Sequence, residues 1–150
     1  MRAVVQRVHK AEVVVGGQVV GSCGQGLCLL VAAHRNDTVA DAEKLANKTA
    51  HLRIFSDAQG KMNLSLLDLV GAGVGVGVLA VSNFTVYGDA AKQRRPSFMD
   101  AAPYEEGQVL FDCFVSRLRA IGLPVQTGVF GTHMEVGLVN DGPVTLILES

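Results

Sequence analysis

This chain has almost no net charge, no C-x-x-C pair of cysteines and no long apolar run. Its 150 residues include 13 Lys and Arg against 14 Asp and Glu, a formal net charge of −1 with histidine neutral. A balance this close to zero gives no overall attraction to polyanions, so any contact with nucleic acid must come from a local basic patch or from shape. With 49% hydrophobic and 18% charged residues, the composition excludes an intrinsically disordered chain.

The three cysteines, Cys23, Cys28 and Cys113, form no C-x-x-C pair and lie in apolar runs. This placement is typical of reduced core residues in an intracellular protein. The first ten residues carry charges and lack the apolar stretch of a signal peptide. No run approaches the roughly 18 apolar residues that a membrane-crossing helix needs. We therefore expect a cytoplasmic protein without a membrane segment.

Glycine, in contrast, is abundant, at 17 of the 150 residues. Glycine is favoured where the backbone must approach another group closely. The length is that of one domain, residues 1–150, and such a domain buries roughly 68–70% of its unfolded surface.

Two helices are indicated by apolar residues at three- and four-residue spacing. The first is capped by Asp37 or Thr38 and ends near Leu52, and the second covers residues 110–121 and is closed by Gly122. Valine-rich or apolar runs predict strands at 2–8, 11–15, 18–20, 26–33, 53–56, 125–130, 134–139 and 144–148, with a hairpin at the G-G pair 16–17. The expected fold is α+β, a single domain of two packed, largely antiparallel β-sheets, barrel-like and covered by two helices.

Gly73, Gly75 and Gly77 alternate with valines and lead into an apolar run over residues 78–81. The dinucleotide-binding pattern G-x-G-x-x-G would need a glycine at residue 76 or 78, where valine stands, and no amphipathic helix follows directly. The period of two instead predicts a strand with one face reduced to glycine, so that another backbone or a helix can lie close.

Several common catalytic groups are missing. The four histidines, at positions 9, 34, 51 and 133, form no H-x-x-x-H or H-E-x-x-H pair, which argues against a catalytic metal. No G-x-S-x-G motif provides a serine nucleophile. Cys113 lies on the apolar face of the second helix, and Cys23 has no basic neighbour in the sequence to lower its thiol pKa. We expect no metal and no cofactor.

Two short stretches carry more polar groups than local structure requires. Residues 82–89 (S-N-F-T-V-Y-G-D) place hydroxyls and an amide where the glycine-rich strand ends, a pattern that ordinary capping also produces. Residues 140–145 (N-D-G-P-V-T) form a turn in which Pro143 removes a backbone donor where the next strand should pair, and a Gly-Pro bond there can be cis. Such a turn presents carbonyl oxygens in a fixed direction for a ligand, although a plain terminal turn also fits.

Together the two stretches resemble the signature pair of the D-aminoacyl-tRNA deacylases, enzymes that hydrolyse D-amino acids from tRNA. The resemblance covers nearly the whole chain. It rests on A-V-V-Q-R-V at 3–8, R-I-F-S-D-A at 53–58, G-K-M-N at 60–63, S-N-F-T at 82–85, R-P-S-F at 95–98 and V-N-D-G-P-V-T at 139–145. The family usually has glutamine where Asn83 stands and leucine where Val86 stands. Asparagine keeps the amide group but shortens its reach.

The resemblance implies a homodimer in which the Gly142-Pro143 turn, with a cis peptide bond, enters the partner subunit's active site beside residues 82–85. There the carbonyls of the turn meet the substrate's α-amino group, and an L side chain is pushed into backbone and excluded. A side chain at residue 142 would fill the space of the substrate's α-carbon. Achiral glycine is not rejected in this way, so glycyl-tRNA is a further expected substrate. Arg7 matches the position that holds the orientation of the turn, although an arginine in a strand is by default a surface charge.

The implied reaction is hydrolysis of the ester between a D-amino acid and the terminal ribose of tRNA. Thr85 is the candidate side-chain nucleophile, but no histidine or lysine stands near it in the sequence to activate it. We therefore favour substrate-assisted chemistry, in which the ribose 2′-hydroxyl helps to activate water and backbone amides around Phe84 and Thr85 stabilise the oxyanion. The family match assigns catalysis to Thr85, Phe84, Gly142 and Pro143, and substrate binding to Ser82, Asn83, Ala102, Phe130 and Met134. Core packing alone also explains the last three.

The strongest local positive cluster is formed by Lys92, Arg94 and Arg95. It suits either contact with tRNA phosphates or a solvated loop. Two rival functions remain open. One is a non-enzymatic β-rich binding module, in which the glycine–valine strand is a dimer edge and the turn is only structural. The other is a sister deacylase that removes L-Ala from mischarged tRNA; a different motif at residues 82–85 and a trans Gly-Pro bond are expected of it, and Arg7 and Phe84 argue against it.

Overall fold

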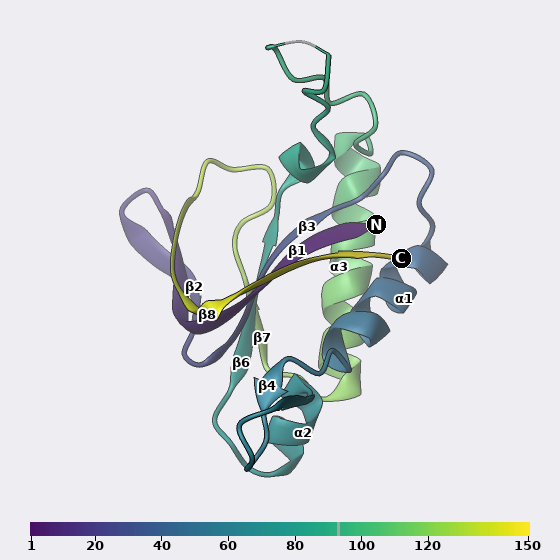
Figure 1. The fold of residues 1–150 in the computed structure, drawn as a ribbon. Coiled ribbons are helices and arrows are strands. Elements are labelled where there is room, and N and C mark those ends of the chain that lie inside the picture. Colours follow the sequence, from purple (N-terminus) through teal and green to yellow (C-terminus); the bar gives the residue numbers. More distant parts are fainter. Residues whose placement is uncertain (93) are drawn as a thin grey trace.

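The computed structural model describes residues 1–92 and 94–150 of the chain. The strands are β1 (Arg2–Val15), β2 (Gln18–Cys23), β3 (Gly26–Ala32), β4 (Phe55–Ser56), β5 (Met62–Leu64), β6 (Gly77–Ser82), β7 (Val125–Thr127) and β8 (Glu135–Glu149). The helices are α1 (Val39–Ala50), α2 (Leu66–Gly71), α3 (Tyr104–Ile121) and a single 3-10 turn, η1 (Phe84–Tyr87). Six strands form one curved sheet with the order β2-β1-β3-β6-β7, in which β8 also pairs with β1, and β4 and β5 form a small second sheet (Figure 1).

β1 pairs with three strands and has partners along both edges. It runs antiparallel to β2, β3 and β8, whereas β3–β6 and β6–β7 are parallel pairs. The β1–β2 hairpin turns at Gly16 and Gly17, whose positive φ angles of 57° and 80° confirm the turn predicted there. The predicted α+β class with a barrel-like fold in one domain is therefore confirmed; the main sheet is mixed, and the second sheet is only the small β4–β5 pair.

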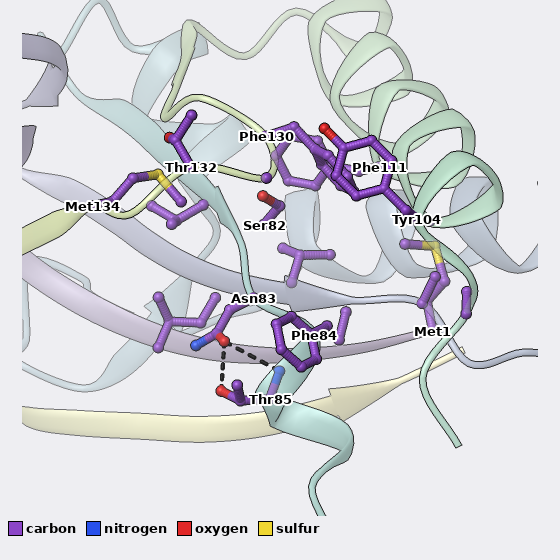
Figure 2. A pocket seen from close by; sticks show the side chains of 18 of the residues that line it. Met1, Ser82, Asn83, Phe84, Thr85, Tyr104, Phe111, Phe130, Thr132 and Met134 are labelled. Atoms are coloured by element: carbon purple, nitrogen blue, oxygen red, sulfur yellow. Dashed lines mark hydrogen bonds between the residues drawn. The ribbon is translucent and has the colours of Figure 1, made fainter. Parts of the chain in front are cut away.

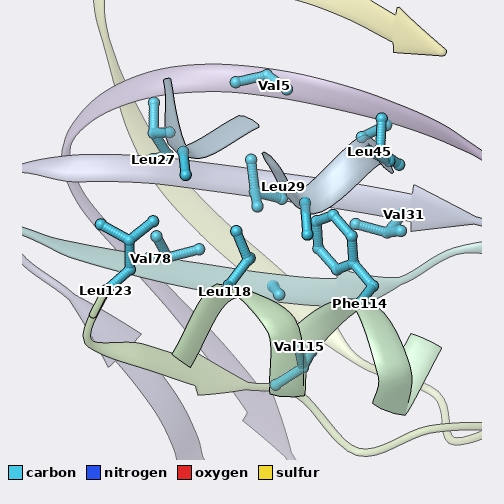
Figure 3. Close-up of a cluster of buried hydrophobic side chains, with 14 of the residues drawn as sticks. Val5, Leu27, Leu29, Val31, Leu45, Val78, Phe114, Val115, Leu118 and Leu123 are labelled. Carbon is cyan, nitrogen blue, oxygen red and sulfur yellow. The ribbon is translucent and has the colours of Figure 1, made fainter. Parts of the chain in front are cut away.

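Helices α1 and α3 pack side by side on one face of the sheet (Figures 1 and 3). Phe114 and Leu118 of α3 are fully buried in the same cluster as Leu29 of β3 and Val78 of β6. Each such side chain contributes about 1.5–3 kcal/mol when removed from water. On the other face of β3, Cys28 belongs to a second buried cluster. The central strands are thus held from both faces, which fixes the position of the residues that follow β6.

The two predicted helices are present, and a third was not foreseen. Thr38 caps α1, and α3 begins six residues earlier than the apolar spacing indicated, at Tyr104. The additional helix, α2, is capped by Ser65, whose hydroxyl accepts a hydrogen bond from the Asp68 amide at 3.1 Å. A helix of six residues is too short to show a period. Within residues 1–92 and 94–150, no helix is long and apolar enough to cross a membrane.

The prediction of a close-packed glycine strand is wrong for Gly73 and Gly75. Both precede β6, and a Cβ added to either would meet no atom of the described chain within 4 Å. Gly77 does begin the strand. The close approach occurs at Gly26 instead, where an added Cβ would lie 1.8 Å from the carbonyl oxygen of Gly77, its neighbour in the parallel β3–β6 pair. Gly26 is therefore the glycine required for this strand contact.

The C-terminal segments also differ from the prediction. β7 ends at Thr127, and residues 128–134 form a loop rather than a continuing strand. The two strands expected at 134–139 and 144–148 are one strand, β8, that pairs with β1 on both sides of a bulge. The register passes from Val8 opposite Asn140 to Gln6 opposite Thr145. Residues 141–144 therefore protrude from the ladder.

Candidate active site

A pocket of about 640 Å³ lies beside the end of β6 (Figure 2). Seven of the residues predicted for the site line it, namely Ser82, Asn83, Phe84, Thr85, Ala102, Phe130 and Met134. They come from three separate segments: the turn after β6, the residues before α3, and the loop between β7 and β8. The fold thus brings together side chains that the sequence keeps far apart.

The turn after β6 forms one wall of the pocket. The Asn83 amide donates to the Val31 carbonyl at 2.8 Å, which ties the turn to the end of β3. Asn83 then caps η1, because its Oδ1 accepts a hydrogen bond from the Thr85 amide at 3.2 Å. Capping by a short amide side chain is a common way to end a strand and begin a helical turn. The local geometry therefore follows from the S-N-F-T sequence itself.

The backbone amide of Phe84 has no hydrogen-bond partner among the described residues, unlike those of Asn83 and Thr85. The Phe84 side chain is 58% exposed, and its ring meets that of Phe98 edge-on at a centroid distance of 5.2 Å. Phe84 lines the pocket, so the described turn has an N–H group without a partner beside it. An amide of this kind is the donor needed to stabilise a developing oxyanion.

The opposite wall is aromatic and includes residues that the sequence did not reveal. Phe130 meets Tyr104 at a centroid distance of 5.1 Å and Phe111 at 6.1 Å (Figure 2). Tyr104 and Phe111 belong to α3. From the sequence alone, an aromatic residue of a helix that lines a pocket cannot be distinguished from one that packs in the core. His133 also lines the pocket. It comes from the loop between β7 and β8, so its place in the pocket wall depends on the fold and not on its position in the sequence.

Gly142 and Pro143 lie in the bulge of β8 and are both exposed. The peptide bond between them is cis. Neither residue is part of the pocket lining in the described chain. The side chain of Asn140 closes the base of the bulge by donating to the carbonyls of Arg7 at 2.8 Å and Val144 at 3.0 Å. The bulge is thus a hydrogen-bonded loop that lies outside the pocket lining of the described chain.

Arg7 fastens the bulge to the body of the protein. Its Nε lies 2.8 Å from Oδ2 of Asp141, and its Nη1 donates to the carbonyl of Ile54 just before β4. The Arg7 side chain is only 12% exposed, whereas His9, 3.4 Å from the other Asp141 oxygen, is largely in solvent. A guanidinium group that is mostly buried and can make several hydrogen bonds in fixed directions is suited to holding a loop in one orientation.

Arg2 and Tyr87 hold η1 against the start of β1. Arg2 Nη1 donates to the carbonyl of Val86 at 3.2 Å, and its guanidinium lies 4.6 Å from the centre of the Tyr87 ring. Burial raises the pKa of the Tyr87 hydroxyl to about 12. Tyr87 is therefore a neutral packing group at physiological pH, and the turn that carries Phe84 and Thr85 is anchored at its far end.

Lys92, Arg94 and Arg95 do not line the pocket in the described part of the chain. They are exposed on the loop between Asp89 and Ser97, which is closed by a pair of backbone hydrogen bonds of 2.8 Å. Residues 89–92 and 94–97 lie beyond η1, at the same end of the molecule as the turn after β6 (Figure 1).

None of the three cysteines lines the pocket in the described chain, and the thiols of Cys23 and Cys28 are also held protonated. Burial raises the pKa of Cys23, and it raises that of Cys28 to about 12, where the nearby Cys23 adds to the effect. Because the thiolate is the reactive form, both residues are inert near neutral pH. Among residues 1–92 and 94–150, no three His, Cys, Asp or Glu side chains gather where a metal ion could bind.

Sequence comparisons identify relatives over the full length of the chain. Residues 4–149 match the family model described as D-Tyr-tRNA(Tyr) deacylase. A protein of Thermomicrobium roseum named D-aminoacyl-tRNA deacylase is 57% identical over 150 residues, which cover 100% of this chain and 94% of that protein. A protein of Chloroflexus aurantiacus with the same name is 55% identical and is covered to 91%.

Two solved structures share the fold. One, titled c-Myc DNA Unwinding Element Binding Protein, superposes with a TM-score of 0.92 at 37% identity and covers 100% of this chain and 99% of its own. The other, titled as a probable eukaryotic D-amino acid tRNA deacylase, has a TM-score of 0.78 at 17% identity and covers 99% and 98%. At that identity the second likeness concerns the fold alone.

Proposed function

The chain belongs to the D-Tyr-tRNA(Tyr) deacylase family, and from this premise we propose that it hydrolyses the ester between a D-amino acid and the 3′-terminal ribose of tRNA. The observation that carries the proposal is the pocket itself. It joins a strand-end turn with a free Phe84 amide to an apolar wall around Phe130. A pocket of about 640 Å³ suits an aminoacyl ester with its ribose rather than the body of a tRNA.

The second part of the proposal is that the active site is shared between two subunits. Gly142 and Pro143 are exposed and lie outside the pocket lining of the described chain. Their strand, β8, pairs only with β1 among the described strands and carries the exposed apolar side chains Val136, Val139, Leu146 and Ile147. A strand with one open edge and exposed apolar side chains favours self-association, and in the proposed two-fold dimer each turn enters the partner's pocket.

In such a dimer the carbonyls of the Gly142-Pro143 turn receive the substrate's α-amino group. A D side chain then points into the apolar pocket, whereas an L side chain is directed at the turn's backbone and is excluded. Glycyl-tRNA has no side chain to exclude and is a further proposed substrate. A cytoplasmic location is proposed as well, in agreement with three free cysteines that suit a reducing compartment.

For the chemical step we propose that the Phe84 amide stabilises the oxyanion and that the ribose 2′-hydroxyl helps to activate the attacking water. A threonine nucleophile needs a base, and Thr85 donates its hydroxyl proton to the Asn83 side-chain oxygen, which is too weakly basic for this role. Ser82, Asn83, Ala102, Phe130 and Met134 surround the aminoacyl group. This assignment needs no metal and no cofactor.

Hydrolysis of D-Tyr-tRNA, compared with the reaction in buffer alone, tests the proposed function. We expect rapid release of D-tyrosine and little release of L-tyrosine from the same tRNA. Hydrolysis of neither ester would favour a non-enzymatic binding module. Removal of L-Ala from mischarged tRNA, without action on D-Tyr-tRNA, would favour the sister deacylase.

Thr85→Ala is expected to lower the single-turnover rate on D-Tyr-tRNA about tenfold, because one positioning hydrogen bond is worth up to roughly 1.4 kcal/mol. Considerable turnover should therefore remain. If Thr85 were the covalent nucleophile, the variant would instead be inactive and the wild-type protein would form an acyl-enzyme that mass spectrometry detects.

The basic loop is expected to bind tRNA phosphates. Replacing Lys92, Arg94 and Arg95 together with Gln should reduce the slope of log Kd for tRNA against log salt concentration by about 0.7–0.9 for each phosphate group that is no longer neutralised. The rate at saturating D-Tyr-tRNA should change little, since the loop lies outside the pocket lining in the described chain. An unchanged salt slope would show that the loop is merely solvated.

A further inference from the structure

Asn83 makes two contacts with Thr85 that together constrain the Thr85 hydroxyl. The Thr85 amide lies 3.2 Å from Oδ1 of Asn83, and the Thr85 Oγ1 lies 2.5 Å from the same oxygen (Figure 2). A backbone N–H can only donate, so the atom of the Asn83 side chain that faces it must be the carbonyl oxygen rather than the nitrogen. The orientation of the amide group is thereby assigned by its neighbour.

The direction of the Thr85 hydroxyl follows from this assignment. An amide oxygen can only accept, so at 2.5 Å it is the Thr85 O–H that donates to Asn83. A hydroxyl has one proton and two lone pairs. With the proton engaged by Asn83, Thr85 has only acceptor capacity left for a ligand in the pocket that both residues line.

We propose that Asn83 is a positioning residue that fixes the Thr85 hydroxyl as a hydrogen-bond acceptor for an O–H or N–H donor of the bound substrate. This inference deepens the proposed function and rests on it. The donors available at the ester end of an aminoacyl adenosine are the ribose 2′-hydroxyl and the α-ammonium group. Both would meet a lone pair of Thr85 rather than its proton.

The same contacts restrict the oxyanion site. Because the Thr85 amide is engaged by Asn83, the Phe84 amide is the unpartnered donor that the described turn offers. The short side chain of asparagine matters here, since Asn and Asp reach the backbone two residues ahead whereas a longer amide does not do so in the same turn. Asn83 therefore sets the polarity of Thr85 in this chain in particular.

Two variants of Asn83 separate its acceptor oxygen from its donor nitrogen. Asn83→Ala removes both, whereas Asn83→Asp keeps an oxygen for the two Thr85 bonds and loses the N–H₂ group. We expect Asn83→Ala to speed amide hydrogen exchange at Thr85 about tenfold and to slow single-turnover hydrolysis of D-Tyr-tRNA by a similar factor. Asn83→Asp should recover most of both losses.

Thr85→Val supplies the matched test of the connection between the two residues, because valine keeps the shape and lacks the hydroxyl. If Asn83 acts through Thr85, Asn83→Ala combined with Thr85→Val should be no slower than Thr85→Val alone. Losses that multiply in the double variant would overturn the inference. Hydrolysis as slow in Asn83→Asp as in Asn83→Ala would do so too, by moving the role to the nitrogen.

Two substrates identify the donor. A tRNA that ends in 2′-deoxyadenosine lacks the ribose O–H, so Thr85→Val should cost nothing further on this substrate if the 2′-hydroxyl is the donor. A persisting cost would assign the α-ammonium group instead.

The exchange measurement needs no substrate, so it distinguishes failure of the inference from failure of the proposed function. Unchanged exchange at Thr85 in Asn83→Ala would overturn the inference. A wild-type protein that shows the expected exchange but does not hydrolyse D-Tyr-tRNA would overturn the proposed function, and with it the role of Thr85 as an acceptor for that substrate.

Discussion

Replacing Gly142 with alanine is expected to lower the hydrolysis of D-Tyr-tRNA at least about a hundredfold, equivalent to roughly 2.7 kcal/mol. A Cβ at this position would lie 2.9 Å from Cγ2 of Val144 and 3.1 Å from Nη2 of Arg7, at a φ of +115° that residues with side chains rarely adopt. Strain of this kind costs on the order of 1–3 kcal/mol. The turn must shift, and its carbonyls no longer meet the substrate. The measurement is the single-turnover rate.

Gly71→Ala is the matched control. Gly71 ends α2, and its added Cβ would meet no atom within 4 Å among the described residues. This variant should keep the wild-type rate and melting temperature. A Gly142→Ala protein that is folded and as fast as the wild type would show that the turn takes no part in the reaction.

Subunit mixing distinguishes a turn that serves its own pocket from one that serves the partner's. Gly142→Ala damages the Gly142-Pro143 turn and leaves the pocket intact. Phe84→Pro removes the free amide of the pocket and leaves the Gly142-Pro143 turn intact. Proline is tolerated at the first position of a helical turn. If the site is shared, equal mixing of the two inactive variants should restore about a quarter of wild-type activity, because half of the dimers carry one complete site. No recovery would contradict the shared site.

Arg7→Met is expected to slow D-Tyr-tRNA hydrolysis at least about thirtyfold. The variant leaves Asp141, which Arg7 contacts at 2.8 Å, with only the exposed His9 at 3.4 Å among the salt-bridge partners in the described chain. Breaking a largely buried pair is strongly destabilising because one charge remains unpaired. The bulge is then free to change direction.

Because Arg7 acts through the Gly142-Pro143 turn, its loss should also lower the ratio of the rate on D-Tyr-tRNA to the rate on L-Tyr-tRNA. A variant that only destabilised the fold would leave this ratio unchanged. Arg117→Met on the exposed face of α3 is the control and should alter neither rate. If Arg7→Met kept both the rate and the ratio, the orientation of the turn would not depend on this side chain.

The sequence predicts those features that depend on local pattern. The apolar spacing of α3, the cap at Thr38 and the G-G hairpin are each determined by neighbouring residues, and all three are present. The same holds for the S-N-F-T turn, since Asn83 caps the residue two positions ahead. These elements could be predicted because their geometry is fixed within a few residues.

The features that were missed depend on contacts between distant segments. Tyr104 and Phe111 enter the pocket wall only because α3 meets the loop that carries Phe130. The alternation of Gly73 and Gly75 with valine looked like a strand, yet Gly73 has a φ of 76° and begins no pairing. The β8 bulge is likewise created by pairing with β1, which holds the chain on both sides of it. None of these contacts has a local signal.

The most direct test of a D-selective deacylase site is the ratio of single-turnover rates on D-Tyr-tRNA and L-Tyr-tRNA made from the same tRNA. The wild-type protein should hydrolyse the D ester at least about a thousandfold faster, a difference of roughly 4 kcal/mol from steric exclusion by the turn. Similar rates on the two esters, or a faster reaction of the L ester, would contradict it.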